Sequence, residues 1–159
     1  MSQNALPKVS IVTPSFNQAP FLEQTLRSVL EQDYPNLEYI VIDGGSTDGS
    51  LEIIHKYADR LAYWQSQPDQ GQTDAINQGF ARASGEILAW LNSDDLLLPG
   101  AVSAAVRALQ AHPEAAMVYG DALLINAEGK TIGKFPAAQT DYRKLRRGYV
   151  HIPQQASFF

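Results

Sequence analysis

Strand-like apolar runs alternate with helical patterns along the first two thirds of the chain, and this alternation constrains the fold most. Short apolar runs, each a candidate strand, occupy residues 9–13, 37–42, 61–64 and 87–91. Each run is followed by apolar residues at helical spacing, as in Leu22, Leu26, Val29 and Leu30. Strands that alternate with helices of this length predict an α/β fold, in which right-handed crossovers build a mainly parallel open sheet with helices on both faces.

Size and composition describe one soluble globular domain. The 159 residues suit a single domain over residues 1–159, with 45% hydrophobic and 18% charged residues. The net charge of -5 argues against nucleic acid as a partner, and the absence of cysteine excludes thiolate chemistry. The chain shows no signal-peptide pattern and no apolar run near the ~20 residues that span a membrane. We therefore expect a cytoplasmic protein, with peripheral contact to the inner face of the membrane left open.

The pattern changes in the last third. Residues 116–126 and 130–135 predict an appended antiparallel hairpin. A short helix with basic side chains is then expected around residues 143–147. The simplest interpretation is a solvated helix face, and contact with a diphosphate, an anionic acceptor or a membrane surface is the alternative. Residues 149–159 predict a further strand, whose apolar side chains look exposed. We expect the domain to be truncated at this end.

Candidate site residues follow three of the expected strands. Phe16, Asp43 and Asp94 each come just after an apolar run, so all three should lie along one edge of a parallel sheet. The run 87–91 stops at Asn92-Ser93-Asp94-Asp95, where carboxylates could hold Mg²⁺ or Mn²⁺ against a diphosphate. A solvated acidic turn is the alternative. The Gly-rich dinucleotide fingerprint and the Walker A sequence are both absent, which disfavours an oxidoreductase or a P-loop protein.

Several short motifs in the right order resemble family-2 glycosyltransferases. They lie at residues 9–17, 26–32, 39–50, 74–79 and 85–95. The resemblance is good over residues 8–126 and loose beyond. It implies a GT-A, Rossmann-like nucleotide-sugar-binding fold. It also implies inverting transfer from a nucleotide-sugar donor, commonly UDP-linked, to an unknown acceptor hydroxyl. Saccharide or lipid-linked acceptors would suit cell-envelope polysaccharide biosynthesis.

The resemblance also implies residue roles. Asp94 would be the metal ligand, for Mg or Mn, because Asn92 replaces the first aspartate of the DxD motif and adds no charge. Phe16 would contact the base and Asp43 would accept its imide N–H; a core phenylalanine and a helix-capping aspartate are the alternatives. Ordinary capping is likewise the alternative for Gln72 and Asp74. The implied donor-binding residues are Pro14, Phe16, Asp43, Gln72, Asp74, Asn92, Ser93 and Asp95.

The catalytic residue remains unknown. Inverting transfer needs a general base, which in the resembled family is an aspartate at a position beyond Phe159. His151 is a substitute, although a lone histidine before a strand is more often structural. The chain would then supply mainly the donor and metal site. A non-catalytic nucleotide-sugar-binding module stays open. A nucleotidyltransferase would want a basic, Gly-rich loop, whereas residues 14–20 contain no Arg or Lys.

Overall fold

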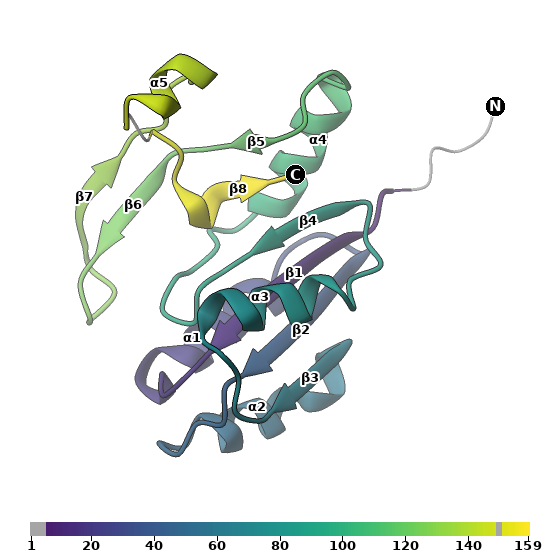
Figure 1. Cartoon of the computed structure of the whole chain (residues 1–159), viewed down its shortest axis with the longest axis vertical. Coiled ribbons are helices and arrows are strands. Elements are labelled where there is room, and N and C mark those ends of the chain that lie inside the picture. Colours follow the sequence, from purple (N-terminus) through teal and green to yellow (C-terminus); the bar gives the residue numbers. More distant parts are fainter. Residues whose placement is uncertain (1–5, 149–150) are drawn as a thin grey trace.

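A four-stranded parallel sheet forms the centre of the computed structural model, which describes residues 6–148 and 151–159 (Figure 1). The strand order is β3-β2-β1-β4, and every neighbouring pair is parallel. All seven residues of β1 are buried, as are the last five of β2, which fits strands covered on both faces. The strands are β1 (Val9–Ser15), β2 (Leu37–Asp43), β3 (Tyr63–Ser66) and β4 (Ile87–Trp90).

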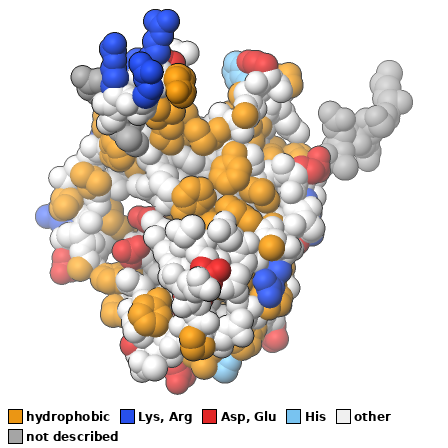
Figure 2. All heavy atoms as spheres, in the orientation of Figure 1, with side chains coloured by type: hydrophobic (Ala, Val, Ile, Leu, Met, Phe, Trp, Pro, Cys, Tyr) orange, Lys and Arg blue, Asp and Glu red, His pale blue; other side chains and the backbone are white. Residues whose placement is uncertain are grey.

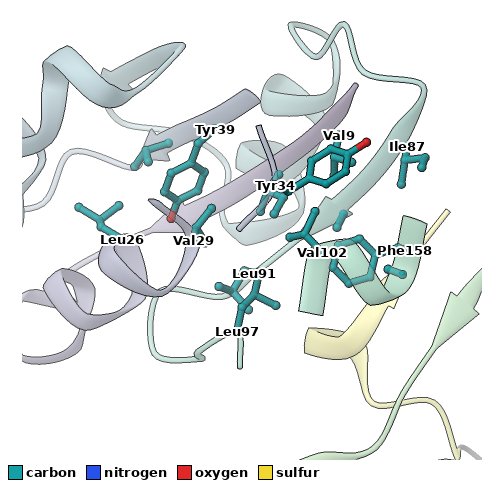
Figure 3. Close-up of a cluster of buried hydrophobic side chains, with 14 of the residues drawn as sticks. Val9, Leu26, Val29, Tyr34, Tyr39, Ile87, Leu91, Leu97, Val102 and Phe158 are labelled. Carbon is teal, nitrogen blue, oxygen red and sulfur yellow. The ribbon is translucent and has the colours of Figure 1, made fainter. Parts of the chain in front are cut away.

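Helices cover both faces of the sheet, which confirms the predicted α/β architecture. One face packs against α1 (Ala19–Leu30), α2 (Ser50–Tyr57) and α4 (Ala101–Ala111), and this side holds the larger apolar core. Figure 3 shows part of that core, with Leu26, Tyr39, Leu91 and Val102 converging between sheet and helices. The other face packs against α3 (Gln72–Phe80). No helix within the described residues has the length and apolar character needed to cross a membrane.

Two elements in the first two thirds of the chain begin two residues later than the sequence predicts. The helix expected from Pro99 begins at Ala101, because Gly100 has φ 77, a left-handed conformation that an α-helix does not accommodate. The strand expected at 61–64 begins instead at Tyr63. A 3-10 turn at Ala58–Arg60 continues α2, so the chain turns toward the sheet later than the apolar run suggests.

The last third forms two antiparallel strand pairs. The predicted hairpin exists as β6 (Ala122–Ile125) with β7 (Thr131–Phe135). Residues 116–126 nevertheless hold two strands, since β5 (Val118–Tyr119) ends at Tyr119 and pairs with β8 (Ser157–Phe158). The expected strand over 149–159 is largely wrong: a 3-10 turn occupies Gln154–Ala156 before β8, and residues 149 and 150 lie outside the described part. The short basic helix is α5 (Tyr142–Arg146), capped by Asp141.

The final two aromatic residues pack onto the sheet, whereas the sequence pattern predicts that they are exposed. Phe158 is 2% exposed and belongs to the larger core. The backbone of Phe159 exchanges two hydrogen bonds with Leu88, with N···O distances of 2.6 and 3.0 Å. Its ring makes edge contacts with Phe80 and Trp90 on the opposite face. The segment therefore covers the outer edge of β4.

Gly79 allows α3 to lie close against β1. A Cβ at this position would fall 2.3 Å from Cγ1 of Val12, a buried residue of β1. We expect Gly79→Ala to lower the free energy of unfolding by about 1–3 kcal/mol in urea titration, although alanine favours helix. Gly120→Ala is the control, because its Cβ would meet no described atom within 4 Å. Equal stability of the two variants would contradict this close-packing argument.

Candidate functional site

Three strands end side by side at one edge of the sheet. β1 lies between β2 and β4, and Ser15 at the end of β1 is in register with Asp43 at the end of β2. β4 ends at Trp90, and the acidic segment follows at once. The structure thus places Phe16, Asp43 and the Asn92–Asp95 segment at the carboxyl edge, where parallel α/β sheets bind ligands.

The acidic segment forms a tight turn with one exposed and one half-buried carboxylate. The N–H of Asp95 donates to the carbonyl oxygen of Asn92 at 3.1 Å, which closes the turn. Asp94 is exposed, while Ser93 is buried. Burial raises the pKa of Asp95, the negative charge of Asp94 raises it further, and a hydrogen bond from Asn92 lowers it. Two carboxylates that repel each other favour a cation beside them.

Asn92 is the centre of a side-chain network. Its Oδ1 accepts from Nε2 of Gln72 at 2.8 Å, and its Nδ2 donates to Oδ2 of Asp95 at 3.1 Å and to Oε1 of Gln154 at 3.2 Å. Gln154 also donates to the carbonyl oxygen of Trp90 at 2.7 Å. Sequence reasoning linked Gln72 and Asn92 to one site but missed Gln154, which lies 62 positions from Asn92. Its one signal was a polar pair, Gln154-Gln155, inside an apolar segment.

Asp43 organises the loop after β2. Its Oδ2 accepts from the N–H groups of Gly45 and Ser46 and from Oγ of Ser66, and its Oδ1 accepts from Oγ of Ser46. The residue is 0% exposed. The expected alternative of helix capping does not describe this arrangement, because the bonds lie within the loop and to β3. A nucleotide base would reach Oδ1 only if the Ser46 side chain moved away.

Phe16 lies on the surface beside two interlocked loops. It is 60% exposed, so the alternative of a core phenylalanine is wrong. Asn17 next to it has φ 52, and its N–H donates to Oγ of Ser46 at 2.8 Å while its Oδ1 accepts from the N–H of Thr47 at 2.9 Å. The loops after β1 and β2 are thereby joined, and the aromatic ring is presented to solvent at the sheet edge.

Within the described part of the chain, the recorded contacts of the other expected site residues do not involve the acidic turn. Pro14 is buried inside β1, opposite Ile42. Asp74 lies in the first turn of α3, where its Oδ2 accepts from the N–H of Gln70 in the preceding loop and from Nε2 of Gln78 one turn later in the helix. The carbonyl oxygen of His151 accepts from the N–H of Ala138, far along the chain from the acidic turn.

The basic cluster is a solvated helix face. Every residue from 141 to 148 is exposed, and Figure 2 shows the Lys and Arg side chains gathered over α5 at the top of the molecule. This agrees with the simplest interpretation of the sequence.

A cavity of about 220 Å³ lies beside the acidic turn. It is lined by Asp94, Phe21 and Gln24 together with the β6–β7 turn.

The donor atoms of the acidic turn suit a hard divalent cation. Asp94 and Asp95 offer carboxylate oxygens, the ligands that Mg²⁺ and Mn²⁺ prefer. Within residues 6–148 and 151–159, no three Asp, Glu, His or Cys side chains converge on one point. The arrangement therefore fits a metal held by one or two carboxylates and completed by substrate oxygens and water, and not a closed protein cage.

An open parallel sheet with an exposed aromatic ring and an acidic turn at its carboxyl edge fits the GT-A fold of glycosyltransferases. The family model for "Glycosyl transferase family 2" matches residues 10–156, so the chain belongs to this family. An uncharacterized glycosyltransferase of Mycobacterium tuberculosis is 40% identical over 157 residues, which cover 96% of this chain and 58% of that relative. The chain thus spans little more than half of that relative's length.

Solved structures show the same fold. A mannosyltransferase from Pyrobaculum calidifontis, in complex with GDP-Man and Mn²⁺, matches 77% of this chain and 37% of its own with a TM-score of 0.67 and 30% identity. S. aureus TarS 1-349, in complex with UDP-GlcNAc, matches 67% of this chain and 32% of its own with a TM-score of 0.61 and 27% identity. Both neighbours are bound to nucleotide sugars.

Proposed function

We propose that this chain binds the donor for an inverting glycosyltransferase, which moves a sugar from a UDP-linked donor to an acceptor hydroxyl. The observation that carries the proposal is the meeting of Phe16, Asp43 and Asp94 at the carboxyl ends of β1, β2 and β4. The exposed ring and the buried acceptor suit a nucleotide base, and the exposed carboxylate suits a divalent metal beside the diphosphate. A cytoplasmic location and a saccharide or lipid-linked acceptor, with contact to a membrane surface, belong to the same proposal.

Asp94 would hold the divalent metal, Mg²⁺ or Mn²⁺, with Asp95 beside it. When bound, such a metal neutralises the charge that develops on a departing nucleoside diphosphate. The exposure of Asp94 supports the assignment, as does Mn²⁺ in the Pyrobaculum calidifontis neighbour. Asn92 would support the site by orienting Asp95, because its Nδ2 donates to the Asp95 carboxylate while its Oδ1 accepts from Gln72.

Phe16 and Asp43 would bind the base. The exposed ring of Phe16 can stack on any base, whereas a carboxylate oxygen selects bases that carry a ring N–H. Uracil and guanine both carry one and cytosine does not. Oδ1 of Asp43 accepts one hydrogen bond, from Ser46, so it has capacity for a second once that hydroxyl turns. The neighbours with UDP-GlcNAc and GDP-Man make guanine the rival to uracil.

Base selection tests the role of Asp43. We expect wild-type protein to bind UDP more tightly than CDP in calorimetry with Mn²⁺, and Asp43→Ala to remove that preference, a loss of about tenfold for one hydrogen bond to a charged acceptor. Ser66→Ala is the control, because it removes a bond to Oδ2 and leaves Oδ1 intact. A UDP preference that survives in Asp43→Ala would refute the role, and tighter binding of GDP would reassign the donor.

Turnover separates the proposed enzyme from a non-catalytic binding module. The general base is proposed to lie outside residues 1–159, so we expect this chain to bind UDP with Mn²⁺ and to release UDP from UDP-sugars slowly or not at all. A coupled assay of UDP release, with oligosaccharide acceptors, measures this. Rapid transfer by the 159-residue chain would show that a described residue serves as base, and His151 would be the first to replace.

A further inference from the structure

A polar stripe on α1 faces the acidic turn and the loop after it. Thr25, Ser28 and Gln32 lie three and four positions apart, so they share one side of the helix. All three hydrogen-bond to the chain between Ser93 and Val102. These bonds link positions that are 66–70 residues apart in the sequence. The stripe therefore attaches the segment after β4 to a rigid element.

Thr25 makes the contacts nearest to the proposed metal ligand. Its Oγ1 lies 2.9 Å from the carbonyl oxygen of Ser93 and 2.9 Å from that of Asp95. These carbonyls belong to the residues on either side of Asp94, and they share the single hydrogen of the hydroxyl. The side chain of Thr25 is fully buried, so water does not compete for these bonds. Both bonds together restrict the backbone that carries Asp94.

The other two residues hold the rest of the loop. Oγ of Ser28 accepts from the N–H of Leu97 at 3.1 Å. Gln32 donates to the carbonyl oxygen of Leu98 at 3.0 Å and accepts from the N–H of Val102 at 3.2 Å. They act beyond the turn, whereas Thr25 alone touches the backbone on both sides of Asp94. The stripe thus has one member at the site and two that support it.

We infer that Thr25 is a positioning residue, which aims the Asp94 carboxylate at the metal by holding the carbonyls of Ser93 and Asp95. This inference rests on the proposed function, because it requires Asp94 to bind a metal. Groups that orient a metal ligand typically change metal affinity by about 10–100-fold when they are removed. Without the hydroxyl, the two carbonyls lose their buried donor and the turn is free to change conformation.

The Mn²⁺ requirement of UDP binding tests the inference. We expect Thr25→Val to raise the Mn²⁺ concentration needed for half-maximal UDP binding by about 10–100-fold, with metal-free UDP affinity unchanged. Thr25→Ser keeps the hydroxyl and should restore the wild-type requirement. Thr13→Val is the matched control: Thr13 is equally buried, but its hydroxyl bonds to Tyr39 on the neighbouring strand β2 and not to the turn. It should lower stability without moving the Mn²⁺ requirement.

Each outcome decides between the inference and the function on which it rests. If wild-type protein shows no Mn²⁺-dependent UDP binding, the proposed function fails. If wild-type binds and Asp94→Ala does not, an unchanged Mn²⁺ requirement in Thr25→Val overturns the inference alone. An equal shift in Thr13→Val would also overturn it, because general destabilisation would then explain both. Should Thr25→Val not fold, Thr25→Ala takes its place; failure of both would make Thr25 a requirement of the fold and not a positioning residue.

Discussion

Replacing Asp94 with alanine is expected to abolish the Mn²⁺-dependent part of UDP binding. Asp94 is the exposed carboxylate of the turn, whereas Asp95 is half-buried and hydrogen-bonded to Asn92. Since Asn92 carries no charge, the loss of Asp94 leaves one half-buried carboxylate, that of Asp95, to attract the metal. We expect affinity to fall by about 100-fold or more, beyond the effect of removing an orienting group.

Isothermal titration calorimetry of UDP with and without Mn²⁺ measures this effect. Asp59→Ala is a suitable control, because Asp59 is also an exposed aspartate but lies in the turn after α2. It should bind as the wild-type protein does. Mn²⁺-dependent binding that persists in Asp94→Ala would remove Asp94 from the metal site. Loss of binding in both variants would point to net charge and not to coordination.

The second large effect concerns stability in acid and comes from Glu38, at the opposite end of the sheet. Its side chain is 10% exposed and pairs with Lys8 at 2.9 Å. The hydroxyl and the N–H of Ser84 donate to its carboxylate at 2.7 and 2.8 Å, and Ser10 donates as well. Burial raises the pKa of Glu38, but the hydrogen bonds from Ser10, Ser84 and Lys8 outweigh it and lower the pKa to about 2.

A carboxyl whose pKa is lower in the folded state stabilises the protein above its unfolded-state pKa. From the unfolded value of 4.5 to about 2, the expected stabilisation at neutral pH is up to about 3 kcal/mol, lost as the pH falls through that window. Glu38→Gln should therefore be less stable than wild type in urea at about pH 7, with a smaller difference at about pH 3. Glu31→Gln, in an exposed pair with Arg27, should change little. A difference that does not depend on pH would contradict the ionic explanation.

Local pattern predicts the centre of this fold well because its strands are buried on both faces. Runs such as 9–13 and 37–42 are mostly apolar, and each helix shows one apolar face, so the parallel sheet follows from the sequence. Prediction is weaker where a strand has two residues. β5 and β8 are too short for a pattern, and each is determined by its partner, so the sequence could not show that Val118 faces Phe158.

The residues of the candidate site also differ in whether the sequence could identify them. Asp43 and Asp94 were identifiable because Asp43 comes at the end of an apolar run and Asp94 comes shortly after another. Thr25 and Gln154 were not, because their contacts join positions more than 60 residues apart and the local sequence does not show those partners. Exposure was also hidden: nothing local distinguishes Phe16 at the surface from a core phenylalanine. The sequence reveals residues at strand ends, and only the tertiary structure reveals those that hold them.

The pairing of Leu88 with Phe159 bears on how the chain folds as it is made. Until residues 154–159 have left the ribosome, β4 has an unpaired outer edge, and Gln154 is not yet there to bond Trp90 and Asn92. An open edge strand is a template for pairing with another chain. The nascent sheet would therefore pass through an aggregation-prone stage that ends when the segment from Gln154 to Phe159 docks. The same event completes the side-chain network at the acidic turn.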